Sequence, residues 1–335
     1  MEIESAADFV RMTRAAIAAA GFVRKEIGGT VYWITPHPPA APSPLTRGEG
    51  NTGAGPTDQP SPLRRGEKVP KADEGSSLPT IVMIHGANDH AGTWFAVAPA
   101  LARTHRVILP DLPGHGDSVP SEGPIPISLI LERLEAIIAA SPLSPLSGER
   151  ARVRGESRAT SAPHRSPLPE GERGLTLVGN SLGGWIALLY ALKHPSQIAR
   201  LFLEASGGLS RAPAVPLVAH TREEAIPILR AVHGPNYQPP EWVIDALLQR
   251  ANGSPMLRLT ELLEHDIEPR LGDINTPTTL IWGEHDGVLP LSYANALMHA
   301  LPNATLQVIE GAAHIPHMQQ PARFLQCLAT AESPS

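Results

Sequence analysis

The stretch Leu175–Lys193 reads LTLVGNSLGGWIALLYALK and determines the fold. The short apolar run LTLV is typical of a buried strand, and Leu182–Lys193 has the length and composition of a buried helix. The pattern G-x-S-x-G joins the two, so it occurs in the strand–turn–helix context that gives the pattern its meaning. Gly179 and Gly183 have no Cβ, which lets strand and helix approach closely. We therefore expect Ser181 to sit on a tight turn with its hydroxyl free.

Strands and helices are predicted to alternate along the rest of the chain. The expected strands are 30–35 (TVYWIT), 80–85 (TIVMIH), 106–109 (RVIL), 175–178 (LTLV), 201–204 (LFLE), 279–282 (TLIW) and 305–309 (TLQVI). The expected helices are 94–102, 127–140, 182–193, 291–300 and 321–331. Several strands are continuous apolar runs, as in strands that are covered on both faces. The alternation predicts an α/β protein with a mostly parallel sheet between two layers of helices.

A further helix is expected at Ser5–Ala20, where Phe9, Thr13 and Ile17 fall on one face. Two interpretations remain for this helix: it packs on the body of the protein, or it anchors the chain to a membrane surface. The nearby apolar run Ala15–Val23 is too short to span a bilayer. Acidic residues occupy the positions where a secretory signal needs positive charge. We therefore expect a cytoplasmic protein without membrane association.

The interval 207–274 interrupts this rhythm and is expected to contain helices only. Thr221 and Glu224 form a capping-box signature ahead of a helix at 225–232. A second helix is expected at 241–251. An all-helical segment between two sheet strands is most simply a cap over one edge of the sheet. We therefore divide the chain into a core of residues 1–207 and 273–335 and a cap of residues 208–272.

Residues 42–77 and 141–173 differ from the rest of the chain. They are rich in Pro, Arg and Glu, and they contain no Phe, Trp or Tyr. A short motif recurs in them, as SPLTRGE, SPLRRGE and SPLPEGE. Such segments cannot bury enough apolar surface to offset the entropy lost on ordering. We interpret them as disordered insertions in surface loops; the alternative is a Pro-rich ligand for another protein.

Composition excludes several classes of function. The formal net charge of −6 argues against a nucleic-acid-binding surface. The single cysteine, Cys327, allows neither a disulfide framework nor a thiolate metal site, and we expect it to lie in the core. The segment 111–118 (DLPGHGDS) holds Asp and His, but its Pro and Gly content indicates a tight turn after a strand. We therefore expect no metal and no cofactor.

A nucleophilic serine needs a base, and the base needs an acid that orients it. In this architecture the acid follows the serine along the sequence, and the histidine comes last. Asp286 and His314 each follow the end of an expected strand, where open parallel sheets place their sites. They are our predicted acid and base. His285 and His317 remain as rival bases.

An acyl-transfer site also needs two backbone donors for the oxyanion. The amide of Leu182 opens the helix after Ser181, and the amide of Ala87 follows the strand TIVMI. These two are the predicted donors. We expect the adjacent His85 to hold the loop rather than to take part in the chemistry.

With HGA, DLPGHGDS, GNSLGG, WGEHD and GAAHIPH in this order, the chain resembles the α/β-hydrolase family. The resemblance covers about residues 22–330, apart from the two insertions. It implies Ser181 as nucleophile, Asp286 as acid, His314 as base, and Ala87 with Leu182 as oxyanion donors. It also implies a substrate pocket under the helical cap. Serine at position 181 argues against the branches of the family that use an aspartate nucleophile.

The resemblance points first to a hydrolase of carboxylic esters. Residues 221–243 are similar to caps in bacterial relatives of monoacylglycerol lipases, which suggests acylglycerols as substrates. Trp94, Leu229 and Trp242 are the predicted substrate-binding residues. Other cap residues that could line a pocket are Ile226, Ile228, Val232, Val243 and Leu247.

Two alternatives to the ester hydrolase remain. One is a carbon–carbon bond hydrolase of the meta-cleavage-product type, which shares GNSLGG. Against it, the loop after His85-Gly86 reads ANDHAG, and Gly287 stands where that family usually has Arg. The other alternative is a hydrolase-like protein that only binds a ligand or a partner. The expected partner in the leading interpretation is a small-molecule ester, and oligomeric state is not predicted.

Overall fold

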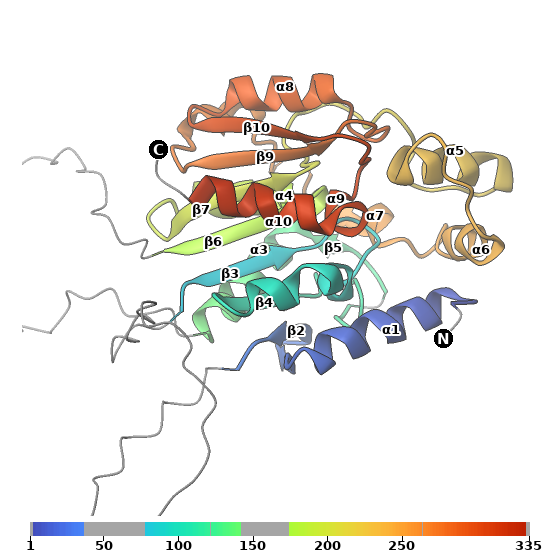
Figure 1. Ribbon diagram of the computed structural model, residues 1–335, viewed down its shortest axis with the longest axis horizontal. Helices are drawn as coiled ribbons and strands as arrows, with labels where there is room; N and C mark the ends of the chain where they lie inside the picture. Colours follow the sequence, from blue (N-terminus) through green and yellow to red (C-terminus); the bar gives the residue numbers. More distant parts are fainter. Residues whose placement is uncertain (1–2, 37–77, 121, 142–173, 263, 333–335) are drawn as a thin grey trace, which may run out of the picture. The chain divides into compact units, whose positions relative to one another are not determined.

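The computed structural model describes residues 3–36, 78–120, 122–141, 174–262 and 264–332 (Figure 1). An eight-stranded sheet runs through it in the order β1-β2-β4-β3-β6-β7-β9-β10. Its strands are β1 (Val23–Ile27), β2 (Thr30–Ile34), β3 (Thr80–Ile84), β4 (Arg106–Pro110), β6 (Leu175–Asn180), β7 (Ile198–Glu204), β9 (Thr278–Gly283) and β10 (Ala304–Ile309).

The six strands from β4 to β10 pair in parallel, whereas β1 and β2 are antiparallel at one edge. The prediction of a mostly parallel α/β sheet is confirmed. Strand β1 was not predicted from the sequence. It reads VRKEI, and four of its five residues are exposed, so it lacks the apolar run that marks the central strands. Charged residues are typical of edge strands, because they discourage pairing with other chains.

Helices alternate with the strands along most of the chain. They are α1 (Ala6–Ala19), η1 (Ala91–Ala96), α2 (Ala98–Leu101), α3 (Ile127–Ala139), α4 (Leu182–Lys193), α5 (Arg222–His233), α6 (Glu241–Gln249), α7 (Pro255–Arg258), η2 (Glu268–Asp273), α8 (Leu291–Ala300), α9 (Pro316–Gln319) and α10 (Pro321–Glu332). The helix expected at 94–102 is instead two short pieces, the 3₁₀ turn η1 and the helix α2. Pro99 lies in the first turn of α2, and a proline there lacks the N–H that a continuous helix would need.

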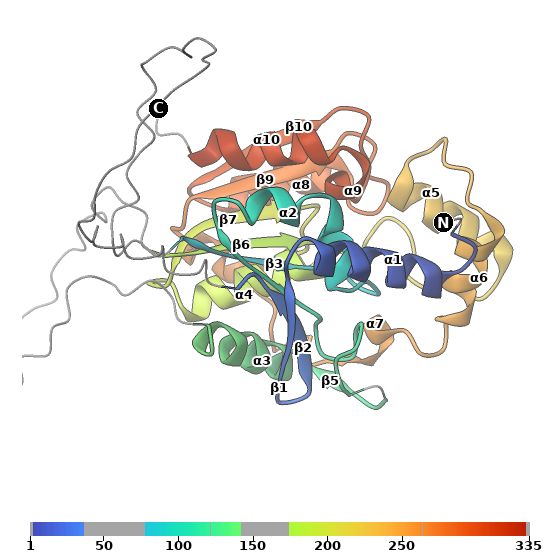
Figure 2. The ribbon, with the colours of Figure 1, turned by 60° about the horizontal axis from the view of Figure 1, so that its bottom comes forward.

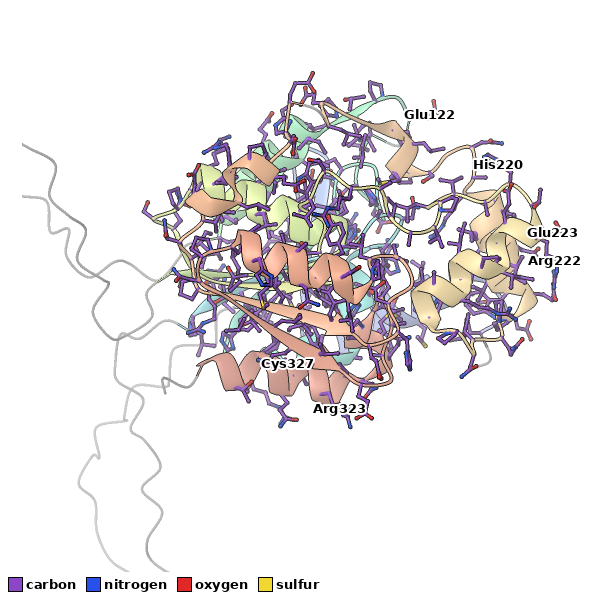
Figure 3. The ribbon with its side chains drawn as sticks, turned by 90° about the horizontal axis from the view of Figure 1, so that it is seen from above. Glu122, His220, Arg222, Glu223, Arg323 and Cys327 are labelled. Carbon is purple, nitrogen blue, oxygen red and sulfur yellow. The ribbon has the colours of Figure 1, made fainter. Side chains whose placement is uncertain are left out.

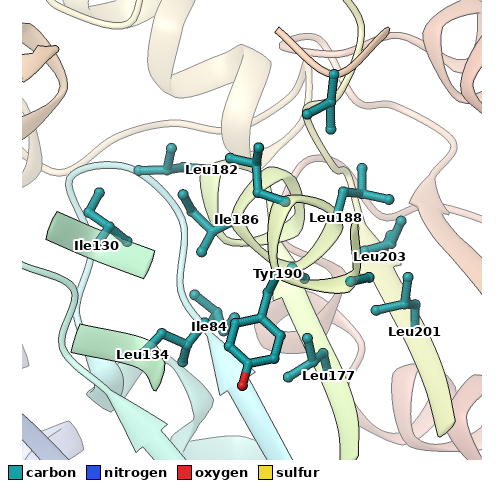
Figure 4. Packing of buried hydrophobic residues seen from close by; sticks show 14 of the residues in the cluster. Ile84, Ile130, Leu134, Leu177, Leu182, Ile186, Leu188, Tyr190, Leu201 and Leu203 are labelled. Atoms are coloured by element: carbon teal, nitrogen blue, oxygen red, sulfur yellow. The ribbon is translucent and has the colours of Figure 1, made fainter. Parts of the chain in front are cut away.

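Side chains alternate between two apolar layers, one on each face of the sheet. In β3, Val82 and Ile84 belong to the layer formed with α3, α4 and α8. Ile81 and Met83 belong to the layer formed with α1, η1, α2 and α10. Figure 2 shows α1, α2 and α10 over one face, and Figure 4 shows α4 buried between sheet and helices on the other. Helix α4 is apolar on nearly all sides, because it is surrounded by protein.

The interval 207–274 contains α5, α6, α7 and η2, and Figure 1 shows α5 and α6 beside one another, apart from the strands. The expectation of helices only is wrong. A two-residue strand, β8 (Leu259–Thr260), pairs in parallel with β5 (Ile125–Pro126). The capping box of Thr221 and Glu224 is present at the start of α5.

Helices α5 and α6 share a small apolar cluster of their own. Its buried members are Ala219, Ala225, Ile228, Leu229 and Ile244. At the outer end of α5, Arg222 bonds both carboxylate oxygens of Glu241 on α6, at 2.5 and 2.6 Å. Figure 3 shows His220, Arg222 and Glu223 projecting from this end. The cap boundaries at 208 and 272 stay a prediction.

Helix α1 lies against the 3₁₀ turn η1. Thr13 and Ile17 are buried, and the rings of Phe9 and Phe95 meet edge to face at 6.5 Å. No helix among the described residues is long and apolar enough to cross a membrane. The two predicted insertions, 42–77 and 141–173, fall outside the described residues except for Ser141.

Candidate active site

Ser181 lies on the turn between β6 and α4, as the G-x-S-x-G pattern predicts. Its backbone has φ 52° and ψ −112°, a left-handed conformation that costs a non-glycine residue on the order of 1–3 kcal/mol. Ser181 is the N-cap of α4, yet its side chain makes no capping hydrogen bond. The strained turn is held by the amide of Ser181, which donates to the carbonyl of Glu204 on β7 at 2.9 Å. The hydroxyl is thus left for other chemistry.

The glycines of the motif allow the close approach that this turn requires. A Cβ on Gly179 would lie 2.4 Å from the carbonyl oxygen of Gly183. One on Gly183 would lie 2.2 Å from the carbonyl oxygen of Ile84 on β3. No real Cβ comes this close to a backbone atom. Glycine is therefore required at these two positions by space alone.

The structure joins the predicted acid to the predicted base. Nδ1 of His314 lies 2.9 Å and 3.1 Å from the two carboxylate oxygens of Asp286. The same carboxylate accepts hydrogen bonds from the amides of Val288 and Leu289, both at 2.9 Å. With Nδ1–H donated to Asp286, the neutral imidazole has Nε2 as its free basic nitrogen. Both side chains are buried.

Asn180 connects this pair to the turn of Ser181. Its side-chain amide donates to the carbonyl of His314 at 3.1 Å. Within the described part of the chain, the Ser181 hydroxyl itself makes no hydrogen bond. The elements that carry Ser181, His314 and Asp286 are thus tied together through the backbone and Asn180.

Ala87 and Leu182 line one cavity together with Ser181. Among the described residues, neither backbone N–H has a hydrogen-bond acceptor, as an oxyanion donor requires. Gly86 brings the Ala87 loop against the turn: a Cβ on Gly86 would lie 3.4 Å from the Cβ of Ser181. The geometry is therefore compatible with two donors beside the Ser181 hydroxyl.

His85 holds this loop, as expected. Its Nε2 accepts a hydrogen bond from the amide of Leu112 at 2.9 Å, so the ring proton must be on Nδ1. That nitrogen lies 2.8 Å from the carbonyl oxygen of Gly86. Asp111 has a similar structural role in the turn that follows β4, because its carboxylate accepts from the amides of Ala91 and Asp117.

The two rival histidines occupy other surroundings. The side chain of His317 is 0% exposed, and its Nδ1 lies 2.7 Å from the carboxylate of Glu204. Its Nε2 lies 2.9 Å from the hydroxyl of Thr93. Both ring nitrogens of His317 are therefore occupied. His285 is 47% exposed and lies beside Glu284.

The cavity at Ser181 has a volume of about 460 Å³ and a mostly apolar wall. The apolar residues of the wall include Trp185, Leu209, Leu217, Met256, Ile267, Val288, Leu289 and Tyr293. Three exposed polar residues, Ser210, Arg211 and Asp266, also line the cavity. An apolar interior with a few polar groups is typical of small-molecule sites.

The predicted substrate-binding residues Trp94, Leu229 and Trp242 do not line this cavity. Trp94 is 0% exposed and its ring lies 4.3 Å from that of His317, in the layer under η1. Leu229 is buried between α5 and α6. Trp242 is half-buried on α6. The other cap candidates, Ile226, Ile228, Val232, Val243 and Leu247, do not line the cavity either.

The sequence did not predict the wall of this cavity, because apolar side chains of α5 and α6 pack against each other. The cavity is instead lined by the start of α4, the chain that follows β7, α7, residues 262 and 266–267, the loop between β9 and α8, and the start of α8. A signal was available at Gly207-Gly208-Leu209, which comes shortly after β7, a strand that neighbours the Ser181 strand in the sheet.

A third histidine, His233, ends α5 near the site. Burial lowers its pKa to about 4; the carboxylate of Asp89 raises it and His314 lowers it further. His233 is thus neutral near pH 7. Cys327 lies in the core as expected, and burial raises the pKa of its thiol. Among the described residues, no three His, Cys, Asp or Glu side chains gather in a way that could hold a metal.

Comparison with known proteins decides the family. The model of the "Alpha/beta hydrolase family" matches residues 81–326. The chain belongs to this family. Human monoacylglycerol lipase ABHD6 is 22% identical over an alignment of 271 positions, and the alignment covers 73% of this chain and 72% of the human one.

Two solved structures are similar in fold. A bacterial membrane phospholipase A, described as a virulence factor, has a TM-score of 0.64 and 21% identity over 98% of this chain and 93% of its own. The meta-cleavage product hydrolase CumD of Pseudomonas fluorescens has a TM-score of 0.58 and 19% identity over 76% of this chain and 90% of its own.

Proposed function

We propose that this α/β hydrolase cleaves carboxylic esters through an acyl-enzyme on Ser181. One observation carries the proposal: Ser181, on a strained turn with an unused hydroxyl, lines the same apolar cavity as the unpaired amides of Ala87 and Leu182. The Asp286–His314 pair is tied to this turn through Asn180. Nucleophile, oxyanion donors, base and acid thus belong to one connected region.

The reaction follows from these positions. Nε2 of His314 takes the proton of Ser181 as the serine oxygen attacks the ester carbonyl carbon. Asp286 stabilises the imidazolium that forms, and its two backbone donors keep the carboxylate oriented. The amides of Ala87 and Leu182 bind the oxyanion. His314 then returns the proton to the leaving alcohol, and water activated by His314 hydrolyses the acyl-enzyme.

The cavity suggests which part of the ester lies where. Its wall beside Ser181 is apolar, so it fits the acyl chain. The polar residues Ser210, Arg211 and Asp266 are exposed, which suits the alcohol side of the ester. Monoacylglycerols, the substrates named for ABHD6, combine one acyl chain with a polar alcohol. We propose them as the first natural substrates to test.

A panel of p-nitrophenyl esters, from acetate to laurate, tests the proposal. Wild type, Ser181→Ala and Ser128→Ala are compared, because Ser128 is an exposed serine outside the cavity. Removing a triad nucleophile costs on the order of 10⁴–10⁶ in kcat. We expect Ser181→Ala to be inactive and Ser128→Ala to match wild type. Wild-type inactivity on every ester, or an active Ser181→Ala, contradicts the proposal.

The fold similarity to CumD favours one second candidate, a carbon–carbon bond hydrolase. Gly287, which follows Asp286, counts against it, because hydrolases of the meta-cleavage-product type usually have Arg at this position. A vinylogous 1,5-diketone acid distinguishes the two candidates. Cleavage of this compound together with inactivity on esters selects the second.

A further inference from the structure

Helix α5 ends against the loops of the predicted acid and base. The last four carbonyls of a helix have no partner within the helix. In α5, the carbonyl of Ala231 accepts from the amide of Gly287, next to Asp286, at 3.0 Å. The carbonyl of Val232 accepts from the amide of His314 itself, also at 3.0 Å. The end of a cap helix is thus bonded to both loops.

One side chain completes this contact. Gln319, at the end of α9, donates from Nε2 to the carbonyl of His233, the last residue of α5, at 2.7 Å. Its Oε1 accepts from the amide of Ala313 at 2.8 Å. Ala313 directly precedes His314. The Gln319 amide therefore bridges the end of α5 and the backbone of residues 310–315, the loop that carries His314 and is called the base loop below. Each half of the amide is used.

We propose that Gln319 is a positioning residue for His314: it fixes the base loop on the end of α5 and so sets where the imidazole stands relative to Ser181. Proton transfer needs a heavy-atom separation of about 2.6–3.2 Å. A misplacement of about 1 Å can cost on the order of 10²-fold in rate. Gln319 does not line the cavity, so it has no direct contact with a substrate bound there. The inference rests on the proposed function.

The neighbouring residue supplies a matched control. Gln320 is also a half-buried glutamine, but its Nε2 donates to the carbonyl of Glu310, at the other end of the base loop from His314, and among the described residues it makes no hydrogen bond with the cap. Replacing Gln320 removes a side-chain-to-carbonyl hydrogen bond at the same helix end. It leaves the contacts between α5 and the base loop in place.

The test compares Gln319→Leu, Gln319→Glu and Gln320→Leu with wild type. Two rates are measured: covalent labelling of Ser181 by a fluorophosphonate probe, and kcat with KM for a short p-nitrophenyl ester. For Gln319→Leu we expect labelling and kcat to fall about 10–100-fold, with KM within twofold of wild type. Gln319→Glu keeps the acceptor for Ala313 but puts a carboxylate against the His233 carbonyl, so we expect it to be as slow. Gln320→Leu should stay within twofold of wild type.

Two glycine-to-alanine variants, at Gly234 and Gly21, repeat the test without altering the Gln319 side chain. Gly234 ends α5 with φ 110°, and its amide donates to the carbonyl of Arg230 at 2.8 Å. Gly21 follows α1 with φ 89°, and no atom lies within 4 Å of a Cβ built there. Alanine strains the backbone at both positions. We expect both variants to lose thermal stability, and only Gly234→Ala to label Ser181 about tenfold more slowly.

Several outcomes would overturn the inference. One is that Gln319→Leu is labelled at the wild-type rate. Another is that Gln320→Leu is labelled as slowly as Gln319→Leu. A change in KM with kcat unchanged would show that Gln319 acts on substrate binding instead. If wild type itself is not labelled at Ser181, the proposed function fails, and the inference fails with it. Labelling of wild type with no effect of Gln319 rejects the inference alone.

Discussion

The side-chain amide of Asn180 donates a hydrogen bond to the backbone carbonyl of His314, with an N···O distance of 3.1 Å. Both residues are buried. The residue before the proposed nucleophile thus holds the residue that carries the proposed base, although 134 positions separate them. Asn180 ends β6 and His314 follows β10, so this bond links the carboxyl ends of two strands, which is where the candidate site lies.

Replacement of Asn180 by Leu should slow ester hydrolysis. The change leaves a buried carbonyl without its donor, which costs about 1–3 kcal/mol, and it frees the base loop to shift. We expect kcat to fall about 10–100-fold, measured in a p-nitrophenyl ester assay. Asn295→Leu is the control, because Asn295 makes the same kind of bond, to Leu291 at 2.9 Å, on the exposed side of α8. Equal rates for both variants would show that the Asn180 bond has no role in positioning.

Substitution of Gly183 by Ala should disrupt the fold. The new Cβ would meet the carbonyl oxygen of Ile84 at 2.2 Å, and backbone atoms cannot move aside cheaply. Overpacking of this kind costs about 1–3 kcal/mol or more. Thermal melts followed by circular dichroism should show a clear loss of Tm. Gly253→Ala, where a Cβ would meet nothing within 4 Å, should leave Tm within a few degrees. A wild-type Tm for Gly183→Ala would contradict the close approach of α4 to β3.

Ser254→Ala should weaken the oxyanion site. The hydroxyl of Ser254 donates to the side chain of Asn88 at 2.6 Å, and Asn88 follows Ala87 in a left-handed conformation with φ 59°. Loss of this bond loosens the loop that presents the Ala87 amide. We expect kcat to fall up to about tenfold, less than the cost of losing a donor outright.

Thr221→Ala is the control for Ser254→Ala. It removes the N-cap of α5 at a cost of about 1 kcal/mol but does not touch the Ala87 loop. Its kcat should stay near that of wild type. If Thr221→Ala slowed the reaction as much as Ser254→Ala, the effect would come from general loosening of the cap.

Much of the site could be predicted from the sequence, because its information is local. The turn at Ser181 follows from the order strand, Gly-x-Ser-x-Gly, helix, and the bounds of α4 and α8 match those expected. The positions of Asp286 and His314 follow from strand ends. None of these depends on distant contacts.

The rest depends on contacts that no local pattern encodes. The partner of His317 is Glu204, 113 residues away. Strands β5 and β8 have two residues each and exist only because they pair with one another. The cavity wall depends on which faces of α5 and α6 are already covered, so the place of Leu229 outside this wall could not be predicted from its local pattern. Charged β1 becomes a strand through its pairing with β2.

Stability should fall as the pH drops below about 6.5. Burial lowers the pKa of His115 to about 3, and that of His233 to about 4. Below pH 6.5 the unfolded chain binds protons at these histidines, whereas the folded chain does not until the pH approaches 4 and 3. Folding is therefore disfavoured progressively through this range. For His115, which is buried, we expect a loss of about 2 kcal/mol between pH 7 and pH 5.

Chemical denaturation of wild type and His115→Asn at both pH values measures this contribution. Asparagine can keep the donor to the carbonyl of Pro113, which Nδ1 of His115 contacts at 3.0 Å, without titrating. Between pH 7 and pH 5, the free energy of unfolding should fall by about 2 kcal/mol less in the variant than in wild type. An identical pH dependence for the two proteins would contradict the depressed pKa of His115.

The central claim is that an acyl group passes through Ser181. The most direct measurement is rapid acid quenching of wild type during turnover of a p-nitrophenyl ester, followed by mass spectrometry of its peptides. We predict one acyl group, on the peptide that contains Ser181, and none in Ser181→Ala. Turnover without such an adduct, or an adduct on another residue such as Cys327, would contradict the claim.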